Sequence, residues 1–343
     1  MPPINNPALL PGSRILVTGV SGFIGSHIAD QLLAAGYLVT GTTRDVSKNS
    51  WLQGLFDNKY GKGKFEIVEV SDLGQVGAFD KLLHGISGII HAASDMTMNP
   101  DPEKVITPMV AATLNILNAA AKQSAVMRFV LTSSCAAAAS PKPGVGQTID
   151  ADVWNDEAVR EAWAPPPYGE ERGFAVYAAS KTEVEREAWR WHREHKPHFI
   201  FNTVLPSMNI GKSLDPVNQG HPSTSFLIQA LFDGNFDIPE NALQYFFIDV
   251  QDTARLHVAA LIHPDVRGER IFAYGKPFTW RGVQRVIQRL YPDKSFARDV
   301  KDAELNTSEI LPAVRAEALL QDMGRPGWTS MDESVRMNTE DLA

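Results

Sequence analysis

The fold is decided by residues 15–25, which read Ile-Leu-Val-Thr-Gly-Val-Ser-Gly-Phe-Ile-Gly. The opening apolar run is typical of a strand buried on both faces, and a helix with Ile24, Ile28 and Leu32 on one stripe follows it as far as Gly36. In the turn between them, the first glycine permits a tight bend, the second lets backbone N–H groups approach a pyrophosphate, and the third allows the helix to pack closely on the strand. This stretch therefore predicts a strand, a phosphate-binding turn and a helix.

The three glycines of this turn, Gly19, Gly22 and Gly25, lie three residues apart. This spacing is a variant of the Gly-x-Gly-x-x-Gly fingerprint of dinucleotide-binding proteins, and a plain glycine turn is the alternative. The position of the turn between a buried strand and a helix favours a dinucleotide site.

Strands and helices alternate from this point through the first two-thirds of the chain. Such alternation predicts an α/β fold, in which a Rossmann-type, doubly wound parallel sheet of six or seven strands carries helices on both faces. After the strand at 15–18, we expect strands at residues 38–43, 65–70, 88–92, 128–132 and 199–205.

The alternation stops after residue 205, where prolines begin to interrupt the chain. We expect residues 1–205 to form the dinucleotide-binding domain, with an irregular, proline-rich insertion at 140–173 that shapes a substrate site. Residues 206–343 are expected to form a smaller α/β lobe that binds substrate and is partly interleaved with the first domain. Its expected elements are a helix from an Asp252 N-cap to Ile262, a strand at 269–274 and a helix at 280–290.

The composition of the 343 residues excludes several classes of protein. Hydrophobic residues make up 44% and charged residues 21%, and the net charge is -8, so no positive field attracts nucleic acid or anionic lipid. The N-terminus lacks the pattern of a signal peptide, and no apolar run reaches the roughly 18 residues that span a bilayer. With a single cysteine, no internal disulfide can form, and we expect a cytoplasmic protein.

The end of the second strand indicates which dinucleotide is bound. The sequence there reads Gly41-Thr42-Thr43-Arg44-Asp45, and an arginine at this place accommodates a ribose 2′-phosphate, so we expect NADP with added positive charge from Lys48. If Asp45 rather than Arg44 faces the ribose, the preference reverses to NAD. A solvated loop cation is the alternative interpretation of Arg44.

Two further strand ends contribute candidate contacts. Asp72, after the third strand, can accept a hydrogen bond from the adenine amino group while Leu73 packs on the ring, or it can cap a helix instead. After the fourth strand, Ala92, Ala93 and Ser94 are small enough for the backbone to pass close to a dinucleotide. His91 is interpreted as a packed strand residue.

Tyr177 and Lys181 carry the predicted chemistry. Residues four apart on a helix share one face, so the phenol and the ammonium can lie in one small site. In the reduction of a carbonyl, hydride reaches the carbon and a proton must be supplied to the oxygen. We expect Lys181 to favour the phenolate of Tyr177 and to bind the nicotinamide ribose, while Ser134 holds the carbonyl oxygen. A core tyrosine beside a solvated lysine is the alternative.

These segments together resemble the extended short-chain dehydrogenases/reductases, and among them the fungal NADPH-dependent aldehyde and carbonyl reductases, which are related to dihydroflavonol and cinnamoyl-CoA reductases. In such enzymes the second serine of the pair Ser133-Ser134 is catalytic, which implies Ser134, although the sequence alone leaves Ser133 open. One departure is Ala111-Ala112-Thr113, where many relatives carry Asn-Gly before Thr. The resemblance rests on residues 17–25, 129–134, 176–183, 196–199, 204–206 and 324–328.

The resemblance implies an NADPH-dependent reductase that converts a hydrophobic aldehyde or ketone to an alcohol. Two alternatives stay open: an NAD-dependent sugar-nucleotide epimerase or dehydratase, which Arg44 disfavours, and a non-catalytic NADP-sensing regulator. The expected partners are a small carbonyl substrate and, as one assembly, a second copy of the chain in a homodimer.

The predicted contacts fall into two sets, and no metal is expected. The cofactor set is Gly19, Ser21, Gly22, Phe23, Ile24, Gly25, Arg44, Lys48, Asp72, Leu73, Ala92, Ala93, Ser94, Thr132, Tyr177, Lys181 and Pro206. The substrate set, within stretches that include 135–141 and 244–246, is Met96, Cys135, Ala136, Ser207, Met208, Asn209 and Tyr245.

Three other patterns are interpreted as structural. Residues 206–213 nearly spell a nucleoside-triphosphate P-loop, but a proline occupies the position of the first glycine. His192 and His195 lack a third metal ligand. Cys135 is taken as a small buried thiol rather than a nucleophile.

Overall fold

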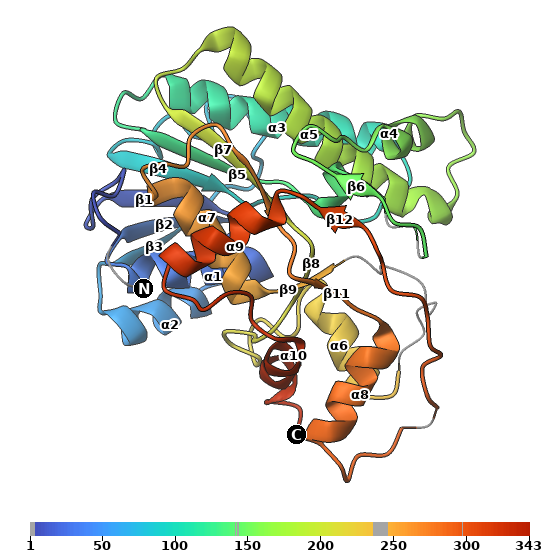
Figure 1. Cartoon of the computed structure of the whole chain (residues 1–343). Coiled ribbons are helices and arrows are strands. Elements are labelled where there is room, and N and C mark those ends of the chain that lie inside the picture. Colours follow the sequence, from blue (N-terminus) through green and yellow to red (C-terminus); the bar gives the residue numbers. More distant parts are fainter. Residues whose placement is uncertain (1–3, 141, 143, 236–245, 297) are drawn as a thin grey trace.

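The computed structural model describes residues 4–140, 142, 144–235, 246–296 and 298–343. Its centre is a seven-stranded sheet in the order β10-β7-β5-β4-β1-β2-β3, in which every neighbouring pair is parallel (Figure 1). The expected Rossmann-type fold is thus confirmed. The strands are β1 (Arg14–Thr18), β2 (Leu38–Thr43), β3 (Phe65–Glu69), β4 (Ile86–His91), β5 (Arg128–Thr132), β7 (Ile200–Pro206) and β10 (Arg270–Ala273).

The apolar runs of the central strands are explained by burial on both faces of this sheet. In β1, Ile15 and Val17 pack into the hydrophobic cluster on one face, whereas Leu16 packs into the cluster on the other. Side chains alternate across a strand, so a strand covered on both faces needs apolar residues at every position.

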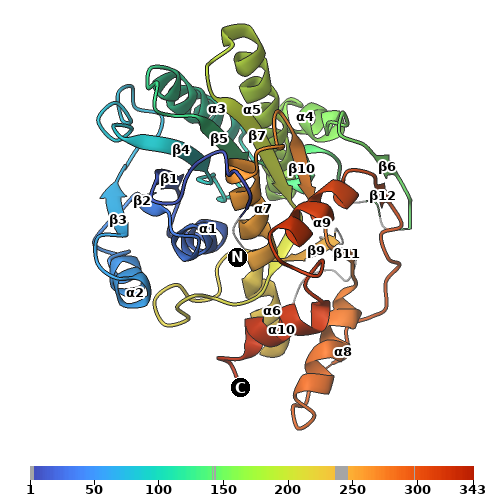
Figure 2. The same cartoon turned by 60° about the vertical axis from the view of Figure 1, so that its left-hand side comes forward.

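Helices cover the two faces as two separate layers (Figure 2). One layer contains α1 (Phe23–Ala34), α2 (Trp51–Tyr60), α7 (Val250–Ile262) and α9 (Ala313–Asp322), whose apolar residues share the cluster of Ile15 and Val17. The other contains α3 (Pro102–Ala121) and α5 (Gly173–His195), which share the cluster of Leu16.

Among the described residues, α3 is the helix whose length and apolar composition would also suit a membrane span. Its residues Ile116, Leu117 and Ala120 are buried in the cluster of Leu16, together with Phe129 of β5. These contacts are those of a core helix in a layered α/β domain.

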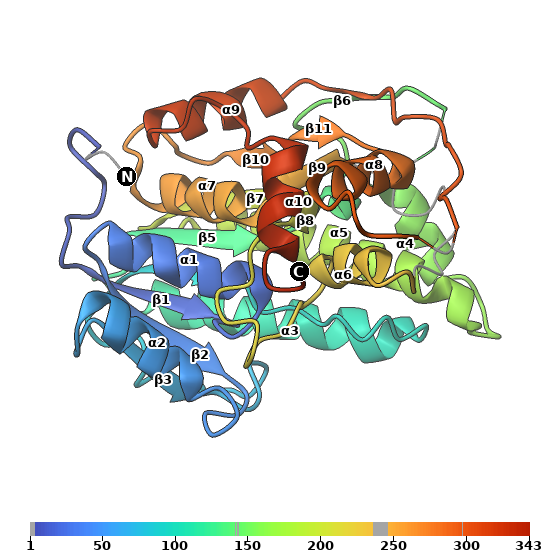
Figure 3. The same cartoon turned by 90° about the horizontal axis from the view of Figure 1, so that it is seen from below.

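A smaller lobe lies beyond the carboxyl edge of the large sheet, on the side to which the strand arrows point, as Figure 3 shows. Its three-stranded sheet has the order β11-β9-β8. Trp280, Phe278 and Phe232 lie at the centre of its own hydrophobic core. The elements of the lobe are β8 (Met208–Ile210), α6 (Ser225–Phe232), β9 (Phe246–Asp249), β11 (Lys276–Pro277), α8 (Trp280–Leu290) and α10 (Met331–Thr339).

The chain passes between the two parts several times. After β9 it returns to the large sheet through α7 and β10, enters the lobe again through β11 and α8, and returns once more to place α9 beside β10. The strand expected at 269–274 therefore exists, but it forms the seventh strand of the large sheet, parallel to β7.

The expected start of α7 is wrong by three residues. The N-cap is Asp249, whose Oδ1 accepts from the N–H of Gln251 at 2.8 Å, and not Asp252. Asp249 ends β9 in an extended conformation, so the helix begins as soon as the strand pairing with β8 stops. Asp252 lies buried in the first turn, where Oδ2 accepts from the N–H of Thr329 at 2.7 Å.

The insertion at 140–173 has more regular structure than expected. It contains α4 (Asp156–Ala162), capped by the side chain of Asn155, and β6 (Thr148–Ile149), which pairs with β12 (Glu309–Ile310). One short 3₁₀ turn, η1 (Cys135–Ala137), precedes it, and another, η2 (Glu170–Arg172), lies at its end. The pairing of β6 with β12 thus fastens the insertion, which follows β5 in the chain, to the C-terminal part of the chain.

Candidate active site

The candidate site lies at the carboxyl edge of the large sheet. Because all seven strands are parallel, the segments that follow β1, β2, β3, β4, β5 and β7 meet at this edge. The strand order reverses direction between β1 and β4, which is where a doubly wound sheet opens a crevice for a ligand.

The glycine turn has the geometry that each glycine was expected to provide. Gly19 has a φ of +66°, and a side chain there would place a Cβ 2.9 Å from the Cα of Ala93. A Cβ on Gly25 would overlap the carbonyl oxygen of Gly19. The N-cap of α1 is Gly22, which makes no side-chain cap, and no acidic residue lies in the first turn. The first-turn N–H groups of α1 therefore remain available to an anion, so this cradle fits a dinucleotide pyrophosphate.

Thr18 fixes the wall opposite the glycine turn. Its Oγ1 accepts from the N–H groups of Ala92 at 3.1 Å and Ala93 at 3.2 Å, so its own proton points at Nδ1 of His91, 2.8 Å away. Burial lowers the pKa of His91 to about 3, which keeps this ring a neutral acceptor. The sequence analysis missed Thr18, because a threonine at a strand end carries no distinguishing pattern.

The end of β2 distinguishes Arg44 from Asp45. The carboxylate of Asp45 accepts from the Ser47 hydroxyl at 2.7 Å and from the Lys48 N–H at 3.0 Å, and these bonds lower its pKa. Arg44 is exposed and makes no hydrogen bond or ion pair within the described residues, whereas the Lys48 ammonium lies 3.8 Å from Asp45. Asp45 is thus committed to its own turn, and Arg44 is the available cation.

The segment after β3 forms turns instead of a helix. Asp72 is exposed, and its Oδ1 accepts from the N–H of Gly74 at 2.8 Å, so it caps a turn. The side chain of Asn115 in α3 donates to the carbonyl oxygens of Leu73 and Gln75, both at 2.9 Å. Asn115 therefore holds the backbone of this loop in place while Leu73 stays half-buried.

A segment of the small lobe lies against the glycine turn. The strap, residues 211–223 between β8 and α6, carries Gln219, whose Nε2 donates to the carbonyl oxygens of Ser21 at 3.2 Å and Gly22 at 3.4 Å, and to Oγ of Ser26 at 3.0 Å. The carbonyl oxygen of Lys212 accepts from His27 of α1 at 2.8 Å. The strap therefore links the small lobe directly to the predicted pyrophosphate cradle.

Ser134, Tyr177 and Lys181 come together beside this cradle. The Tyr177 hydroxyl donates to Oγ of Ser134 at 3.4 Å, and the Lys181 ammonium donates to the carbonyl oxygen of Thr132 at 3.3 Å. The Thr132 hydroxyl lies 2.8 Å from Nε2 of His257, whose Nδ1 donates to a backbone carbonyl. The first serine of the pair points elsewhere: Ser133 donates to Oε2 of Glu185 at 2.7 Å. Of the two serines, Ser134 is thus the one that shares a site with the tyrosine.

The protonation states differ in part from those expected. Burial raises the pKa of Tyr177 to about 12, although the hydrogen bond with Ser134 acts in the opposite direction. Burial also lowers the pKa of Lys181 to about 8, and the charge of Glu185 opposes this shift. In the protein alone, desolvation therefore dominates the pKa of Tyr177, and its acidification by Lys181 stays a prediction for the complex with the dinucleotide. A neutral phenol at pH 7 still carries the proton that an acid must donate.

The predicted substrate residues differ in how exposed they are and in whether their side chains already have partners within the protein. Met96 is exposed, whereas Cys135 and Ala136 are buried behind Ser134, and burial raises the pKa of the Cys135 thiol to about 11. Ser207 binds both backbone groups of Phe246. Two side chains are committed within the protein: Met208 lies in the core of the small lobe, and the Asn209 amide bonds to the Ser207 carbonyl and the Thr253 hydroxyl. Tyr245 and Gln244 lie outside the described residues.

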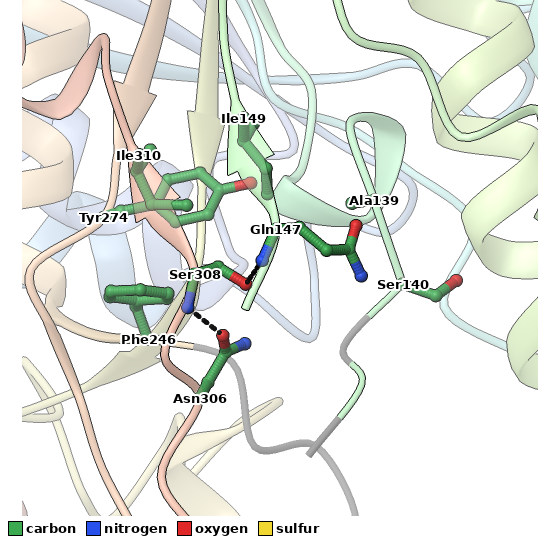
Figure 4. Close-up of a pocket in the computed structure, with 9 residues that line it drawn as sticks. All are labelled: Ala139, Ser140, Gln147, Ile149, Phe246, Tyr274, Asn306, Ser308 and Ile310. Atoms are coloured by element: carbon green, nitrogen blue, oxygen red, sulfur yellow. Dashed lines mark hydrogen bonds between the residues drawn. The ribbon is translucent and has the colours of Figure 1, made fainter. Parts of the chain in front are cut away.

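A small cavity opens between the insertion and the small lobe (Figure 4). Its volume for a water-sized molecule is about 10 Å³, which is room for a single water. Ala139 and Phe246 lie on two of the stretches expected to contact substrate. The Tyr274 hydroxyl donates to the carbonyl oxygen of Cys135 at 3.2 Å, so the cavity adjoins the Ser134 turn. The lining residues are Ala139, Ser140, Gln147, Ile149, Phe246, Tyr274, Asn306, Ser308 and Ile310.

The near-P-loop and the two histidines, which the sequence analysis interpreted as structural, make contacts within the protein. In the near-P-loop, the Lys212 ammonium pairs with Glu340 at 2.6 Å. His192 and His195 bond to backbone carbonyls of Phe199 and Trp191. Within the part of the chain that the structure describes, no group of three or more His, Cys, Asp or Glu side chains is placed to hold a metal ion.

Comparisons with known proteins agree with this geometry. Aldehyde reductase 2 of Sporidiobolus salmonicolor is 40% identical over 98% of this chain and 98% of its own length. Ketoreductase adrE of Penicillium rubens is 40% identical over 95% of both chains. Among solved structures, Gre2 of Candida albicans in complex with NADPH superposes with a TM-score of 0.81 and 25% identity, covering 96% of this chain and 98% of that one. Residues 15–275 match the NAD dependent epimerase/dehydratase family. The chain therefore belongs to that family, the extended short-chain dehydrogenases/reductases.

Proposed function

We propose that this protein is an NADPH-dependent reductase that converts a hydrophobic aldehyde or ketone to the alcohol. The observation that carries the proposal is the Tyr177 hydroxyl 3.4 Å from Oγ of Ser134, with the buried Lys181 one helical turn further on. Relatives with reductase names match nearly the whole chain, which supports the same reaction class.

Ser134, Tyr177 and Lys181 have different roles in this proposal. When bound, the reduced dinucleotide supplies the hydride that reaches the carbonyl carbon. Tyr177 and Ser134 both donate to the carbonyl oxygen, and Tyr177 then releases its proton to that oxygen. Lys181 stabilises the resulting phenolate and holds the nicotinamide ribose. The high pKa of Tyr177 keeps its proton in place until negative charge develops on the substrate.

The cofactor is proposed to lie along the carboxyl edge of the sheet. Gly19, Ser21, Gly22, Phe23, Ile24 and Gly25 would surround its pyrophosphate, and Arg44 with Lys48 would bind the 2′-phosphate. The remaining predicted contacts follow the same edge: Asp72, Leu73, Ala92, Ala93, Ser94, Thr132, Tyr177, Lys181 and Pro206.

Hydrophobic carbonyl compounds are the proposed substrates. The Ser134 turn is enclosed by the cluster of Cys135, Ala138, Phe246 and Tyr274, which offers a wall of apolar and aromatic groups. The exposed Met96 would add an apolar contact at the rim. A charged sugar nucleotide finds few complementary charges in this cluster.

Replacing Tyr177 with Phe tests the reaction. The change removes the proton donor and keeps the ring, so oxidation of NADPH with an aromatic aldehyde should slow at least about 100-fold. The matched control is Tyr168→Phe, because this tyrosine is exposed in the insertion and is not one of the three proposed catalytic residues. Retained activity in the Tyr177 variant would contradict the mechanism, and activity only with sugar nucleotides would contradict the substrate class.

The finer organisation is also proposed. Residues 1–205 would bind the cofactor and residues 206–343 would supply much of the substrate wall. We also propose a cytoplasmic location, in keeping with the single buried thiol, and a homodimer, the commonest assembly of enzymes. Cell fractionation and light scattering after size-exclusion chromatography would test the last two.

A further inference from the structure

A buried carboxylate lies one helical turn beyond Lys181. Glu185 in α5 is 0% exposed, and burying a carboxylate is costly unless its oxygens are paired and hydrogen-bonded. Here both oxygens are satisfied by side chains. The donors are Ser133 at 2.7 Å, Thr203 at 2.7 Å, Trp189 at 3.3 Å, and Arg270 at 2.8 Å through Nε and 3.2 Å through Nη2.

These donors come from different elements of the sheet. Ser133 directly follows β5, Thr203 lies in β7 and Arg270 begins β10, so one carboxylate ties α5 to three adjacent strands. The Arg270 guanidinium also donates to the carbonyl oxygens of Ala151 and Val153 at 2.6 and 2.9 Å, and it lies 3.9 Å from the Trp154 ring centroid. The insertion is therefore fastened to the same group.

The contact with Ser133 determines where Ser134 points. The backbone of Ser134 is extended, with φ of -159° and ψ of 155°, so the chain continues straight on from Ser133. Ser133 is held by Glu185 and Ser134 bonds to Tyr177, so the anchored Ser133 determines which part of α5 the next serine can reach. Tyr177, Lys181 and Glu185 follow at intervals of four on one stripe of α5.

Glu185 also differs in charge from the other groups around Lys181. Burial lowers the pKa values of His91 in β4 and His257 in α7 to about 3 and about 4, and the charge of Lys181 acts in the same direction, so both rings are neutral. Tyr177 on the same helix is neutral as well, with its pKa raised to about 12. The charge of Glu185 opposes the burial of Lys181, while Arg270 pairs with Glu185 from β10.

We propose that Glu185 is a positioning residue of the active site: its carboxylate orients Ser134 through Ser133 and places a negative charge one helical turn from Lys181. The inference rests on the proposed function, because it assigns Ser134 and Lys181 their roles in carbonyl reduction. Glu185 itself touches neither substrate nor cofactor in this arrangement.

The substitution Glu185→Gln tests the electrostatic part. Glutamine keeps the shape and one acceptor but removes the charge, so the pKa of Lys181 should fall further below its usual value. We expect kcat to drop at least about tenfold, and the alkaline limb of kcat/KM to move about one pH unit toward lower pH. A purely structural role for Glu185 would not move that limb.

Two further variants keep the test sharp. Thr203→Val removes one hydrogen bond from the same carboxylate and keeps its charge, so it should lower Tm and leave the alkaline limb in place. Glu185→Gln combined with Arg270→Met removes both charges. It avoids a stranded guanidinium if the single variant fails to fold. Because the two removed charges are opposite, we expect the limb to move in the same direction as in Glu185→Gln but by less.

Titration of Lys181 gives a readout that needs no catalysis. In cofactor-free protein with ¹³Cε-labelled lysine, the Lys181 resonance, assigned by its loss in Lys181→Arg, should titrate near the pKa of about 8 in wild type. It should titrate about one pH unit lower in Glu185→Gln. An unshifted Lys181 titration would overturn this inference. Wild-type protein that oxidises no NADPH with any carbonyl compound would instead overturn the proposed function.

Discussion

In the proposed site, Arg44 is the cation from which we expect the largest effect on the preference for NADPH. Asp45 is held by Ser47 and Lys48, so Arg44 has no acidic competitor from its own turn. The change Arg44→Ser should reduce kcat/KM for NADPH about tenfold or more, since a charge-assisted bond to phosphate is lost, and leave the value for NADH nearly unchanged.

The control for Arg44 removes one positive charge at the opposite edge of the large sheet. Lys62→Ser alters an exposed cation between α2 and β3, at the amino end of the sheet. Its kinetics with both dinucleotides should match wild type. A wild-type preference for NADH, or equal losses in both variants, would contradict the role given to Arg44.

Gly25 and Gly54 form a natural pair for testing the cradle. A methyl group on Gly25 overlaps the Gly19 carbonyl, whereas one on Gly54 in α2 meets nothing within 4 Å. Gly25→Ala should therefore lower Tm and abolish tight NADPH binding measured by calorimetry. Gly54→Ala should raise stability by about 0.5–1 kcal/mol, because alanine is the better helix former, and leave binding unchanged. Tight binding by Gly25→Ala would show that the cradle is not where the pyrophosphate lies.

At the scale of elements, the N-cap of α7 makes stability depend on pH. Burial and the nearby Asp252 raise the pKa of Asp249 to about 7, above the value near 3.9 of an unfolded chain. The folded state thus holds a proton that the unfolded state has lost, and stability falls as pH rises from about 4 to about 7. Asp249→Asn keeps a capping oxygen without titrating, so this fall should disappear from its plot of Tm against pH.

The exposed Asp293 provides the comparison for Asp249. Asp293 lies in a surface turn after α8, and the Tm of the Asp293→Asn variant should depend on pH as the Tm of the wild type does. If Asp249→Asn shows the wild-type decline as well, the titrating group lies elsewhere.

Several elements in both parts of the molecule could be predicted because their signals are local. The expected bounds of β2, β5 and α8 match the structure, since apolar alternation and flanking breakers fix each one within its own segment. The first residue of α7 was missed because β9 ends where its pairing with β8 ends, and that partner lies some 40 residues away. The assignment of β10 to the large sheet likewise depends on a distant strand, β7.

The candidate site was predictable to the extent that its motifs are short. Tyr177 and Lys181 lie on one helix, and Ser134 ends a recognisable strand. Glu185 looks like a solvated helix charge in the sequence, and only Arg270, 85 residues later, reveals that it is buried and paired. Sequence alone also left Ser133 and Ser134 equivalent, because which serine reaches Tyr177 depends on the contact between Ser133 and Glu185.

At the scale of the whole molecule, the repeated crossings between the large sheet and the small lobe make the two parts interdependent. The sheet formed by residues 1–205 lacks α7, β10 and α9, which cover one face and one edge of it. We expect the full chain to unfold in a single transition that coincides for tryptophan fluorescence and far-UV circular dichroism. Residues 1–205 produced alone should lack a cooperative transition, and a stable isolated fragment would contradict this.

The strap gives the molecule an order of events. Gln219 grips the glycine turn from the same lobe that contributes Phe246 beside the Ser134 turn. We expect a spent dinucleotide to leave after this grip is released, and the release should loosen the wall against which the alcohol rests. We therefore expect compulsory sequential turnover, with the dinucleotide first to arrive and last to depart.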